Sequence, residues 1–334
     1  MNKILCFGEL LLRMSPALHG KWIHDAQMPV YVGGAELNVA TAMACWQLPV
    51  KYVTALPKNY LSDEIVAELD SRKIDSSAIH FSGERVGIYF LPQGADLKHT
   101  GVVYDRAGSS FSDLKPGVLD WDDILKDVRW FHFSAISPAL TGDIASVCEE
   151  AIKAASAKNI RISIDLNYRA QLWQMRGDPR PIIQNLVQYC DVVMGNIWSA
   201  NALLGIEVDR NLESAERRDY LEQGVRTALS IRKQFPKSKT IAQTFRFDHG
   251  GTRVNYYGLL FHEDKSYSSR EFTGEKIIDK VGSGDCFMAG LIYGFCHRLA
   301  PQDIIDFASS AAFGKFYEMG DSTRQTVKSI QSRI

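Results

Sequence analysis

The chain has 334 residues, of which 46% are hydrophobic and 23% are charged, a composition ordinary for a globular protein. This length can form one large α/β domain or two smaller ones, and either can bury a substantial core. The 38 basic and 39 acidic residues leave a net charge of −1, so the whole chain has no electrostatic attraction to nucleic acid or to an anionic membrane.

The six cysteines are widely scattered and form no CxxC pair, which indicates small buried side chains in a reducing compartment. Neither they nor the eight histidines have metal-binding spacing, so we predict no metal site built from protein side chains. The N-terminal apolar run is interrupted by Glu9 and lacks a small-residue cleavage site, so we interpret it as a strand. No apolar run is long enough to span a bilayer. We therefore predict a cytoplasmic protein that binds neither membrane nor nucleic acid.

Extended runs in the first third of the chain predict a small sheet that stands off the main body. Residues 22–32 alternate loosely and contain Pro29, which suits an edge strand. Residues 86–91 and 101–104 predict a hairpin. We therefore place the strands of a lid within roughly residues 10–32 and 86–106.

The other predicted elements alternate between apolar strands and amphipathic helices. Strands are predicted at residues 3–7, 51–56, 128–135, 160–165 and 191–194, and a further hairpin at 239–245 and 253–261. Helices are predicted directly after the Gly33-Gly34 pair, from Ser62, across residues 144–155, within the charged stretch 207–235, and from Pro301. In the charged stretch, one face should carry Leu221, Val225, Ala228 and Leu229.

This alternation predicts an α/β fold in which a mostly parallel central sheet is covered by helices on both faces. The sequence contains no internal repeat or obvious linker, so we predict a single domain over residues 1–334. Ligands of such sheets bind beyond the carboxyl ends of the strands. Glu9, residues 165–169, Gly195-Asn196 and residues 282–285 are therefore expected to line one edge.

The turn Gly282-Ser283-Gly284-Asp285 runs directly into an apolar helix and predicts an anion site. Gly282 and Gly284 allow backbone angles that a side chain would forbid, so their N–H groups can converge with the unpaired N–H groups of the helix start. Such a cradle holds a phosphate or a developing oxyanion. Asp285 beside it is suited to accept a proton from an attacking hydroxyl, although Asp is also a common helix-start residue.

Two motifs about 245 residues apart resemble the signatures of the ribokinase-like (PfkB) carbohydrate kinase family, and the resemblance covers nearly the whole chain. They are Gly33-Gly34 with Asn38, and Asp279 with Gly282, Ser283, Gly284 and Asp285. The resemblance implies a three-layer fold with a β-sheet lid that is often shared across a dimer. It also implies Asp285 as catalytic base, the amides of residues 282–284 as the anion hole, and ATP with Mg²⁺ as the phosphoryl donor.

A finer resemblance connects the chain to the 2-keto-3-deoxygluconate kinases within that family. It implies a sugar-acid site and a nucleotide site. The sugar-acid residues would be Gly33, Gly34, Asn38, Tyr89, Tyr104, Arg106, Arg169, Asp285 and Asp321, and the nucleotide residues Asn167, Arg169, Asn196, Thr244, Arg246, Gly282 and Gly284. The chemistry agrees, because Arg106 and Arg169 offer bidentate donors that match a carboxylate.

Two positions depart from the family pattern and leave alternatives open. Ser199 stands where the family has a glutamate that organises magnesium, and Arg246 stands where the first glycine of the nucleotide loop is expected. An arginine there either crowds the nucleotide or pairs with its phosphates. The alternatives to a keto-deoxygluconate kinase are a fructokinase, or another sugar kinase of the family, and a catalytically weak protein that binds sugar acids.

Overall fold

The computed structural model describes residues 2–18, 20–93, 101–174, 176–209, 211–212, 216–250 and 253–334. Its strands are β1 (Lys3–Phe7), β2 (Leu11–Met14), β3 (Val30–Gly33), β4 (Val50–Val53), β5 (Ala55–Leu56), β6 (Ile74–Asp75), β7 (His80–Phe81), β8 (Gly87–Phe90), β9 (Val103–Asp105), β10 (Val128–Ser134), β11 (Arg161–Asp165), β12 (Val192–Gly195), β13 (Thr240–Asp248), β14 (Val254–His262), β15 (Lys265–Ser268) and β16 (Phe272–Gly274). Its helices are α1 (Trp22–Asp25), α2 (Ala35–Cys45), α3 (Tyr60–Ser71), α4 (Trp121–Ile124), α5 (Ser137–Leu140), α6 (Gly142–Ala157), α7 (Ala170–Trp173), α8 (Arg180–Val187), α9 (Ile197–Leu204), α10 (Arg217–Gln234), α11 (Ser283–Cys296), α12 (Pro301–Lys315) and α13 (Val327–Gln331).

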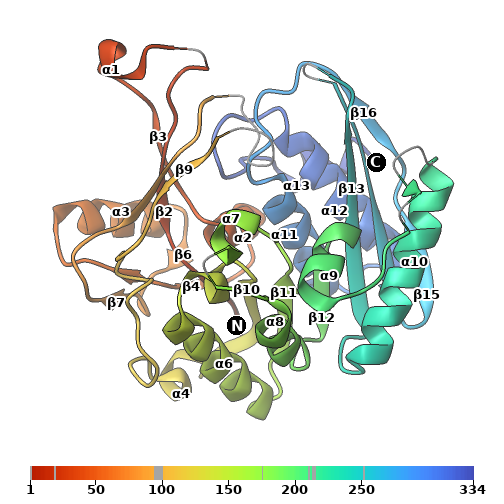
Figure 1. Cartoon of the computed structure of the whole chain (residues 1–334), viewed down its shortest axis with the longest axis horizontal. Helices are drawn as coiled ribbons and strands as arrows, with labels where there is room; N and C mark the ends of the chain where they lie inside the picture. Colours follow the sequence, from red (N-terminus) through yellow and green to blue (C-terminus); the bar gives the residue numbers. More distant parts are fainter. Residues whose placement is uncertain are drawn as a thin grey trace.

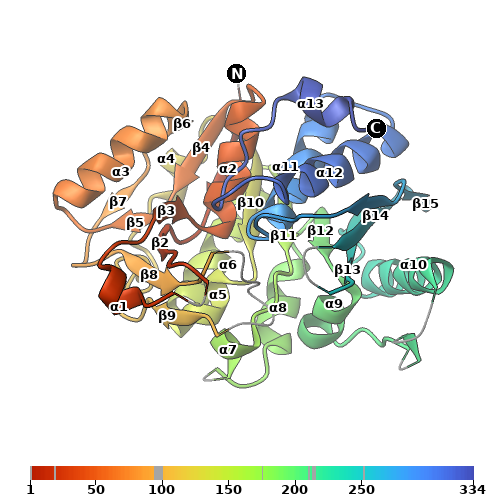
Figure 2. The same cartoon turned by 90° about the horizontal axis from the view of Figure 1, so that it is seen from above.

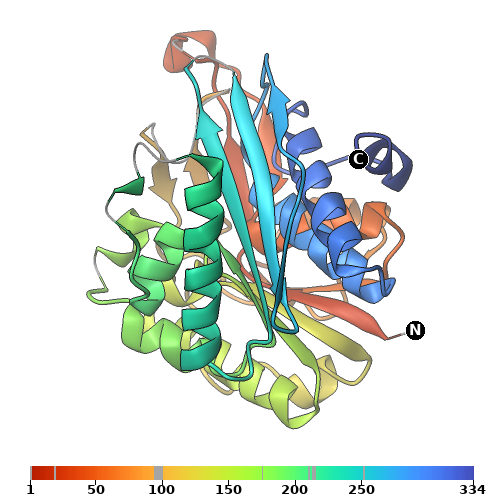
Figure 3. The ribbon, with the colours of Figure 1, turned by 90° about the vertical axis from the view of Figure 1, so that its right-hand side faces the viewer.

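The main sheet runs through the centre of the molecule (Figures 1 and 3). Among the described residues it has ten strands in the order β15-β14-β13-β12-β11-β10-β1-β4-β6, with β16 also paired to β14. Neighbours from β13 to β6 are parallel, whereas β14 is antiparallel to β13, β15 and β16. The predicted α/β class and mostly parallel sheet are confirmed.

Helices cover both faces of this sheet, which confirms the predicted layers (Figure 2). The strand β1 shows why. Its Ile4 and Cys6 belong to a core with side chains of α2, α3, α11 and α12, whereas Leu5 and Phe7 belong to a second core with α6, α8, α9 and α10. Because successive side chains of a strand point to opposite faces, an unbroken apolar strand supplies both cores at once.

The smaller sheet, for which we keep the name lid, has the order β3-β2-β8-β9. The hairpin predicted from residues 86–91 and 101–104 is the antiparallel pair β8 and β9. Strand β2 follows β1 after only three residues, Gly8 to Leu10, so the lid is attached directly to the middle of the main sheet. Residues 94–100 of the predicted hairpin connection lie outside the described residues.

Three local predictions were wrong. Residues 22–25 form the helical turn α1, so the strand expected over 22–32 shrinks to β3. Helix α3 begins at Tyr60, two residues before Ser62, because the side chain of Asn59 caps it by accepting the Ser62 N–H at 3.1 Å. In α10, Ala228 is buried and Leu221 and Val225 are partly buried as predicted, but Leu229 is 50% exposed. The other buried residues of this helix are Gln223, Gly224, Thr227 and Ile231.

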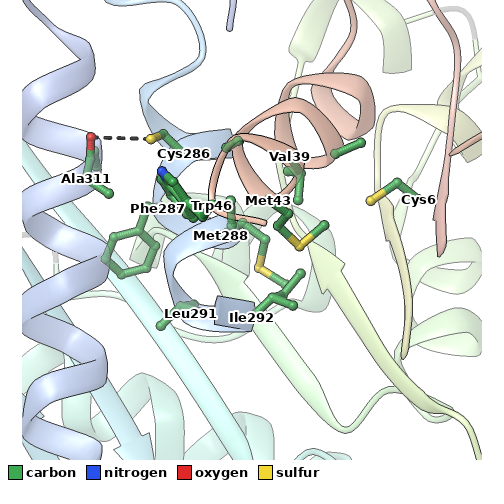
Figure 4. Close-up of a cluster of buried hydrophobic side chains, with 14 of the residues drawn as sticks. Cys6, Val39, Met43, Trp46, Cys286, Phe287, Met288, Leu291, Ile292 and Ala311 are labelled. Carbon is green, nitrogen blue, oxygen red and sulfur yellow. Dashed lines mark hydrogen bonds between the residues drawn. The ribbon is translucent and has the colours of Figure 1, made fainter. Parts of the chain in front are cut away.

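Helices α2 and α11 pack against one another over an apolar core, shown in Figure 4. Val39 and Met43 of α2, and Trp46 directly after this helix, lie beside Met288 and Ile292 of α11. On its other side α11 packs closely on α12, since a Cβ added at Gly290 would lie 2.6 Å from the Cα of Ala308. The core thus fixes the positions of the two helix N-termini, which follow the two glycine motifs.

The prediction of buried, unpaired cysteines holds for Cys6, Cys148, Cys190 and Cys286, whereas Cys45 at the end of α2 is exposed. Within the described residues, every helix is too short or too polar to cross a membrane. The cytoplasmic location stays a prediction.

Candidate active site

A cavity of about 660 Å³ lies between the lid and the carboxyl ends of the main-sheet strands. Its lining combines lid residues, the segments after β11 and β12, the strand β13 and the start of α11. Among the predicted site residues, the cavity is lined by Gly34, Asn38, Tyr89, Tyr104, Arg106, Asn167, Arg169, Asn196, Thr244, Arg246, Gly282, Ser283, Gly284, Asp285 and Asp321. The structure therefore brings together residues that the chain separates by almost 290 positions.

The turn at residues 282–284 has the shape of an anion site, although only one of its glycines has an unusual backbone angle. Gly282 caps α11 with φ +77°, and a Cβ there would collide with the backbone oxygen of Asp321. Gly284 lies within the first turn of the helix, where a Cβ would meet no atom within 4 Å. The expectation of a special angle at Gly284 was wrong; its missing side chain instead leaves the cavity open beside the helix N–H groups.

Asp285 lies at this N-terminus and points toward α2. The amide of Asn38 donates a hydrogen bond to Asp285 Oδ2 at 2.7 Å. Burial raises the pKa of Asp285 to about 8; the hydrogen bond from Asn38 opposes the rise and the nearby Asp165 adds to it. A carboxyl with such a pKa is a competent proton acceptor near neutral pH.

The segment after β11 supplies a second carboxylate and an arginine. Asp165 accepts the backbone N–H of Asn167 at 3.1 Å, and burial raises its pKa to about 6. The half-buried Arg169 lowers the pKa of both Asp165 and Asp285 by its charge, so it lies within electrostatic reach of both. Its guanidinium donates to the backbone oxygen of Tyr168, and no carboxylate of the described residues forms an ion pair with it.

The lid contributes two neighbouring tyrosines and an arginine whose partner the sequence did not reveal. Tyr89 and Tyr104 pack with ring centroids 6.3 Å apart. Arg106 donates to the buried Glu9 through Nε at 2.7 Å and through Nη2, and Ser109 donates to the same carboxylate. Glu9 follows the carboxyl end of β1, as predicted, but it does not line the cavity. Because Nε and Nη2 of Arg106 already donate to Glu9, one edge of this guanidinium is occupied. Arg106 is therefore less suited to bind a substrate carboxylate than we expected.

Asp321 belongs to a buried charge cluster behind the lid. The O–H of Tyr89 donates to Asp321 Oδ2 at 2.6 Å, and Arg13 donates to Asp321 Oδ1 at 3.0 Å. Burial raises the pKa of Asp321, and the charge of Arg13 opposes that rise. Gly33 is outside the cavity lining, but a Cβ there would collide with the Asp321 carboxylate, so the first glycine of the pair makes room for this side chain.

The side of the cavity formed by α9 and β13 carries the residues predicted for the nucleotide. The side-chain oxygen of Asn196 accepts the Ser199 N–H at 2.8 Å and caps α9. Thr244 and Arg246 extend from β13. Arg246 pairs with Asp248 at 3.3 Å, and Lys280 pairs with the same carboxylate at 2.9 Å. Two cations thus lie beside the start of α11.

Sequence reasoning placed Asp165 at this edge of the sheet, and Asp165 lines the cavity, but it missed Lys280 and Arg13 as parts of this region. Lys280 lies inside the second glycine motif, so its position along the chain could have indicated the cavity. Arg13 could not have been found in this way, because its partners Asp279 and Asp321 are more than 260 residues away.

The cavity fits a magnesium ion that arrives with a nucleotide. Mg²⁺ is commonly bound by one or two carboxylates, substrate phosphates and waters. Asp165 and Asp285 supply two carboxylates in the cavity, and the described residues contain no cluster of three or more metal-ligating side chains. Ser199 lines the cavity with a hydroxyl where the resembled family carries a glutamate, so Asp165 would hold the ion or its waters.

Comparisons with known proteins agree with this geometry. A family model described as pfkB family carbohydrate kinase matches residues 1–316. The crystal structure of a 2-dehydro-3-deoxygluconokinase from Thermotoga maritima has a TM-score of 0.91 and 33% identity, with 100% of this chain and 99% of that chain covered. A 2-dehydro-3-deoxygalactonokinase from Haloferax volcanii is 29% identical over 87% of this chain and 83% of its own length. A fructokinase from Xylella fastidiosa with bound ATP shares the fold, with a TM-score of 0.76 at 20% identity, over 99% of this chain and 97% of its own.

The raised pKa of Asp285 predicts that replacing this carboxyl stabilises the protein, depending on pH. The folded state holds the proton up to about pH 8, whereas an unfolded aspartate loses it near pH 4. Stability therefore falls as the pH rises through this window and stays reduced above it. Asp285→Asn removes this cost and can still accept the Asn38 hydrogen bond, so its melting temperature should exceed the wild type by about 1 to 5 °C at pH 8.5.

Thermal melting at pH 8.5 and pH 4.5 measures this difference, which should nearly vanish at the lower pH. The exposed Asp113, changed to Asn, is the matched control and should show no such pH dependence. A melting temperature of Asp285→Asn below that of the wild type at pH 8.5 would contradict the interpretation that ionised Asp285 destabilises the fold.

Proposed function

This chain belongs to the pfkB family of carbohydrate kinases, and we propose that it phosphorylates the terminal hydroxyl of a 2-keto-3-deoxy sugar acid, with 2-keto-3-deoxygluconate as the first candidate. The observation that carries this proposal is the position of Arg169 in the cavity. It is near the proposed base Asp285, and among the described residues no carboxylate forms an ion pair with it. A sugar carboxylate supplies such a partner.

On the sugar side, the proposed contacts come from both glycine motifs and from the lid. Asn38 and Asp321 offer an amide and a carboxylate for hydroxyl groups, and the rings of Tyr89 and Tyr104 form an apolar wall. Gly34 has φ +131°, and a Cβ there would collide with the backbone oxygen of Glu9, so the chain can pass the cavity only without a side chain. Arg106, held by Glu9, shapes this wall and contributes charge at its margin.

The proposed reaction is an in-line transfer. Asp285 accepts the proton of the substrate hydroxyl as its oxygen forms a bond to the γ-phosphorus of ATP, and the bond from that phosphorus to the bridging oxygen of ADP breaks. The N–H groups at residues 282–284 stabilise the charge on the transferred phosphoryl group. Magnesium, when bound, neutralises charge on the donor phosphates.

On the donor side, Asn167, Asn196, Thr244 and Arg246 are proposed to contact the nucleotide. The guanidinium of Arg246 can donate two hydrogen bonds to phosphate oxygens. Of the two alternatives for an arginine at this position, crowding the nucleotide or pairing with its phosphates, this is the second. Lys280, which shares Asp248 with Arg246, adds a further positive charge beside the turn at residues 282–284, hereafter the anion turn. This arrangement favours a phosphate-binding role for Arg246 over a blocking one.

A substrate panel tests the proposal. Release of ADP is measured with 2-keto-3-deoxygluconate, 2-keto-3-deoxygalactonate, fructose and ribose, each with ATP and Mg²⁺. We expect kcat/KM to be highest for one of the two sugar acids. A preference for fructose would favour the fructokinase alternative. Binding of a sugar acid without turnover would favour the alternative of a binding protein.

Replacing Asp285 should remove the proton acceptor while leaving the fold intact. We expect Asp285→Asn to lower kcat by roughly 10² to 10⁴-fold. In the wild type, kcat/KM should rise with pH up to about 8, because burial raises the pKa of this carboxyl to that value and only the deprotonated form accepts the proton. Steady-state kinetics from pH 5.5 to 9 measure both effects. A profile that is flat below pH 8 would contradict the assignment.

Arg169→Ala should separate acidic from neutral substrates. A hydrogen-bonded pair with a charged group contributes about 1.5 to 3 kcal/mol, so kcat/KM for the sugar acid should fall about 10 to 100-fold more than kcat/KM for fructose. Arg106→Ala is the matched comparison, because Glu9 already holds that guanidinium. Equal losses for both sugars in Arg169→Ala would instead place this arginine on the transferred phosphate.

The outer side of the lid suggests a dimer. Ile23 in α1 is 95% exposed, and Val30 and Val103 on the edge strands β3 and β9 are about half exposed. Exposed apolar side chains on unpaired sheet edges are typical of an interface. We expect Ile23→Asp combined with Val30→Asp to convert a dimer into a monomer in size-exclusion chromatography with light scattering. Tyr60→Asp, at an 84% exposed position on α3, should leave the dimer unchanged. A monomeric wild type would contradict this proposal.

A further inference from the structure

Arg13 of strand β2 is fully buried at 0% exposure, and it lies behind the cavity without lining it. One nitrogen, Nη1, donates to Asp279 Oδ2 at 2.9 Å and to Asp321 Oδ1 at 3.0 Å. The other terminal nitrogen donates to Ser15 at 3.3 Å. Burying a guanidinium is costly unless its charge is compensated, so this arginine and its two carboxylates form one interdependent cluster.

The first carboxylate, Asp321, lies between this cluster and the cavity. Its Oδ1 faces Arg13, and its Oδ2 accepts the hydroxyl of Tyr89. An uncompensated carboxylate here would repel a substrate that carries a carboxylate of its own, because the cavity wall excludes the water that would screen the two charges. The pairing with Arg13 removes most of that repulsion while leaving Asp321 able to accept hydrogen bonds.

The second carboxylate, Asp279, belongs to the turn that precedes α11. Its Oδ1 accepts the N–H of Val281 at 3.0 Å, and its Oδ2 accepts the N–H of Gly320 at 3.2 Å in addition to Arg13. Asp279 therefore ties the anion turn to the segment that carries Asp321. The backbone oxygen of Asp321 in turn packs against Gly282.

A second buried cation, Lys315, shares this region, so the cluster is close to neutral. Lys315 donates to the backbone oxygen of Glu318 at 3.0 Å and interacts electrostatically with Asp279 and Asp321. Within the described residues Lys315 donates no hydrogen bond to either carboxylate, whereas Arg13 donates to both. Without Arg13, Lys315 would be the only cation left in this cluster, and it does not contact either carboxylate directly.

We propose that Arg13 is a positioning residue with two separable effects: its charge lets Asp321 line a pocket for an acidic sugar, and its bridge between Asp321 and Asp279 fixes the anion turn. The proposal rests on the proposed sugar-acid substrate. The charge acts on the choice between acidic and neutral sugars and therefore on KM. The bridge acts on the position of the N–H groups at residues 282–284 and therefore on kcat.

Four variants separate these effects: Arg13→Lys, Arg13→Met, Asp321→Asn, and the double variant Arg13→Met with Asp321→Asn. Kinetics with the preferred sugar acid and with fructose give KM and kcat for each. Arg13→Lys keeps the charge but cannot bridge both carboxylates with the same geometry. We call the ratio of kcat/KM for the sugar acid to kcat/KM for fructose the acid-to-neutral selectivity. Arg13→Lys should keep this ratio within about threefold of the wild-type value and lower kcat about tenfold or more.

Arg13→Met should lower the acid-to-neutral selectivity about tenfold or more, and adding Asp321→Asn should restore most of that selectivity, because the repelling charge is then absent. Calorimetric binding of the sugar acid without nucleotide gives a readout independent of turnover. If Arg13→Met does not fold, recovery of a cooperative thermal transition in the double variant tests the same compensation.

Equal losses for acidic and neutral sugars in Arg13→Met, or a double variant no better than the single one, would overturn the inference while the proposed function stands. A wild type that prefers fructose would instead overturn the proposed function, and the selectivity half of this inference with it.

Discussion

The hydrogen bond from Asn38 to Asp285 connects residues 247 positions apart and joins the two glycine motifs at one point. It exists because α2 and α11 pack side by side on the same face of the main sheet, so that their N-termini lie together beyond the strand ends. Each helix begins after a glycine with positive φ, Gly34 or Gly282, and each glycine makes a close backbone approach that a side chain would block. The cavity is a consequence of this arrangement.

Burial in this region creates an electrostatic cost that the sequence alone does not reveal. The pKa of Asp285 rises to about 8, that of Asp165 to about 6 and that of Glu36 to about 7, and burial is the leading cause in each case. Glu36 lies in the first turn of α2, where the backbone N–H of Ser134 donates to it at 2.8 Å. Because burial disfavours the ionised form of these three carboxyls, they make the folded protein less stable than apolar side chains would at the same positions. This cost is understandable if at least one of them, Asp285, must accept a proton.

Much of the fold followed from local patterns because those patterns are themselves the cause of the structure. The alternating run 160–165 forms β11, although its polar Ser163 and Asp165 are buried as well. The face containing Ile144, Val147 and Ala151 forms α6, since period and burial agree there. The prediction failed where a local signal competed with context, as in α1 at residues 22–25, or where side chains other than apolar ones fill the buried face of a helix. In α10 that face includes Gln223, whose amide donates to the backbone oxygen of Glu207 at 3.1 Å.

The site was predictable in its membership but not in its pairing. Strand ends and glycine turns indicate which residues share an edge, because topology fixes that edge. They do not indicate that Glu9 pairs with Arg106, or that Arg13 pairs with Asp321, since these ion pairs depend on how far each side chain reaches in the assembled lid. These pairings decide which arginine remains for a substrate. With Arg106 held by Glu9 and Arg13 held by two aspartates, Arg169 is the arginine near the proposed base with only a backbone acceptor, Tyr168, among the described residues. Under the proposed function, the selectivity of the cavity would therefore depend as much on the charges paired behind its wall as on the side chains that face the sugar.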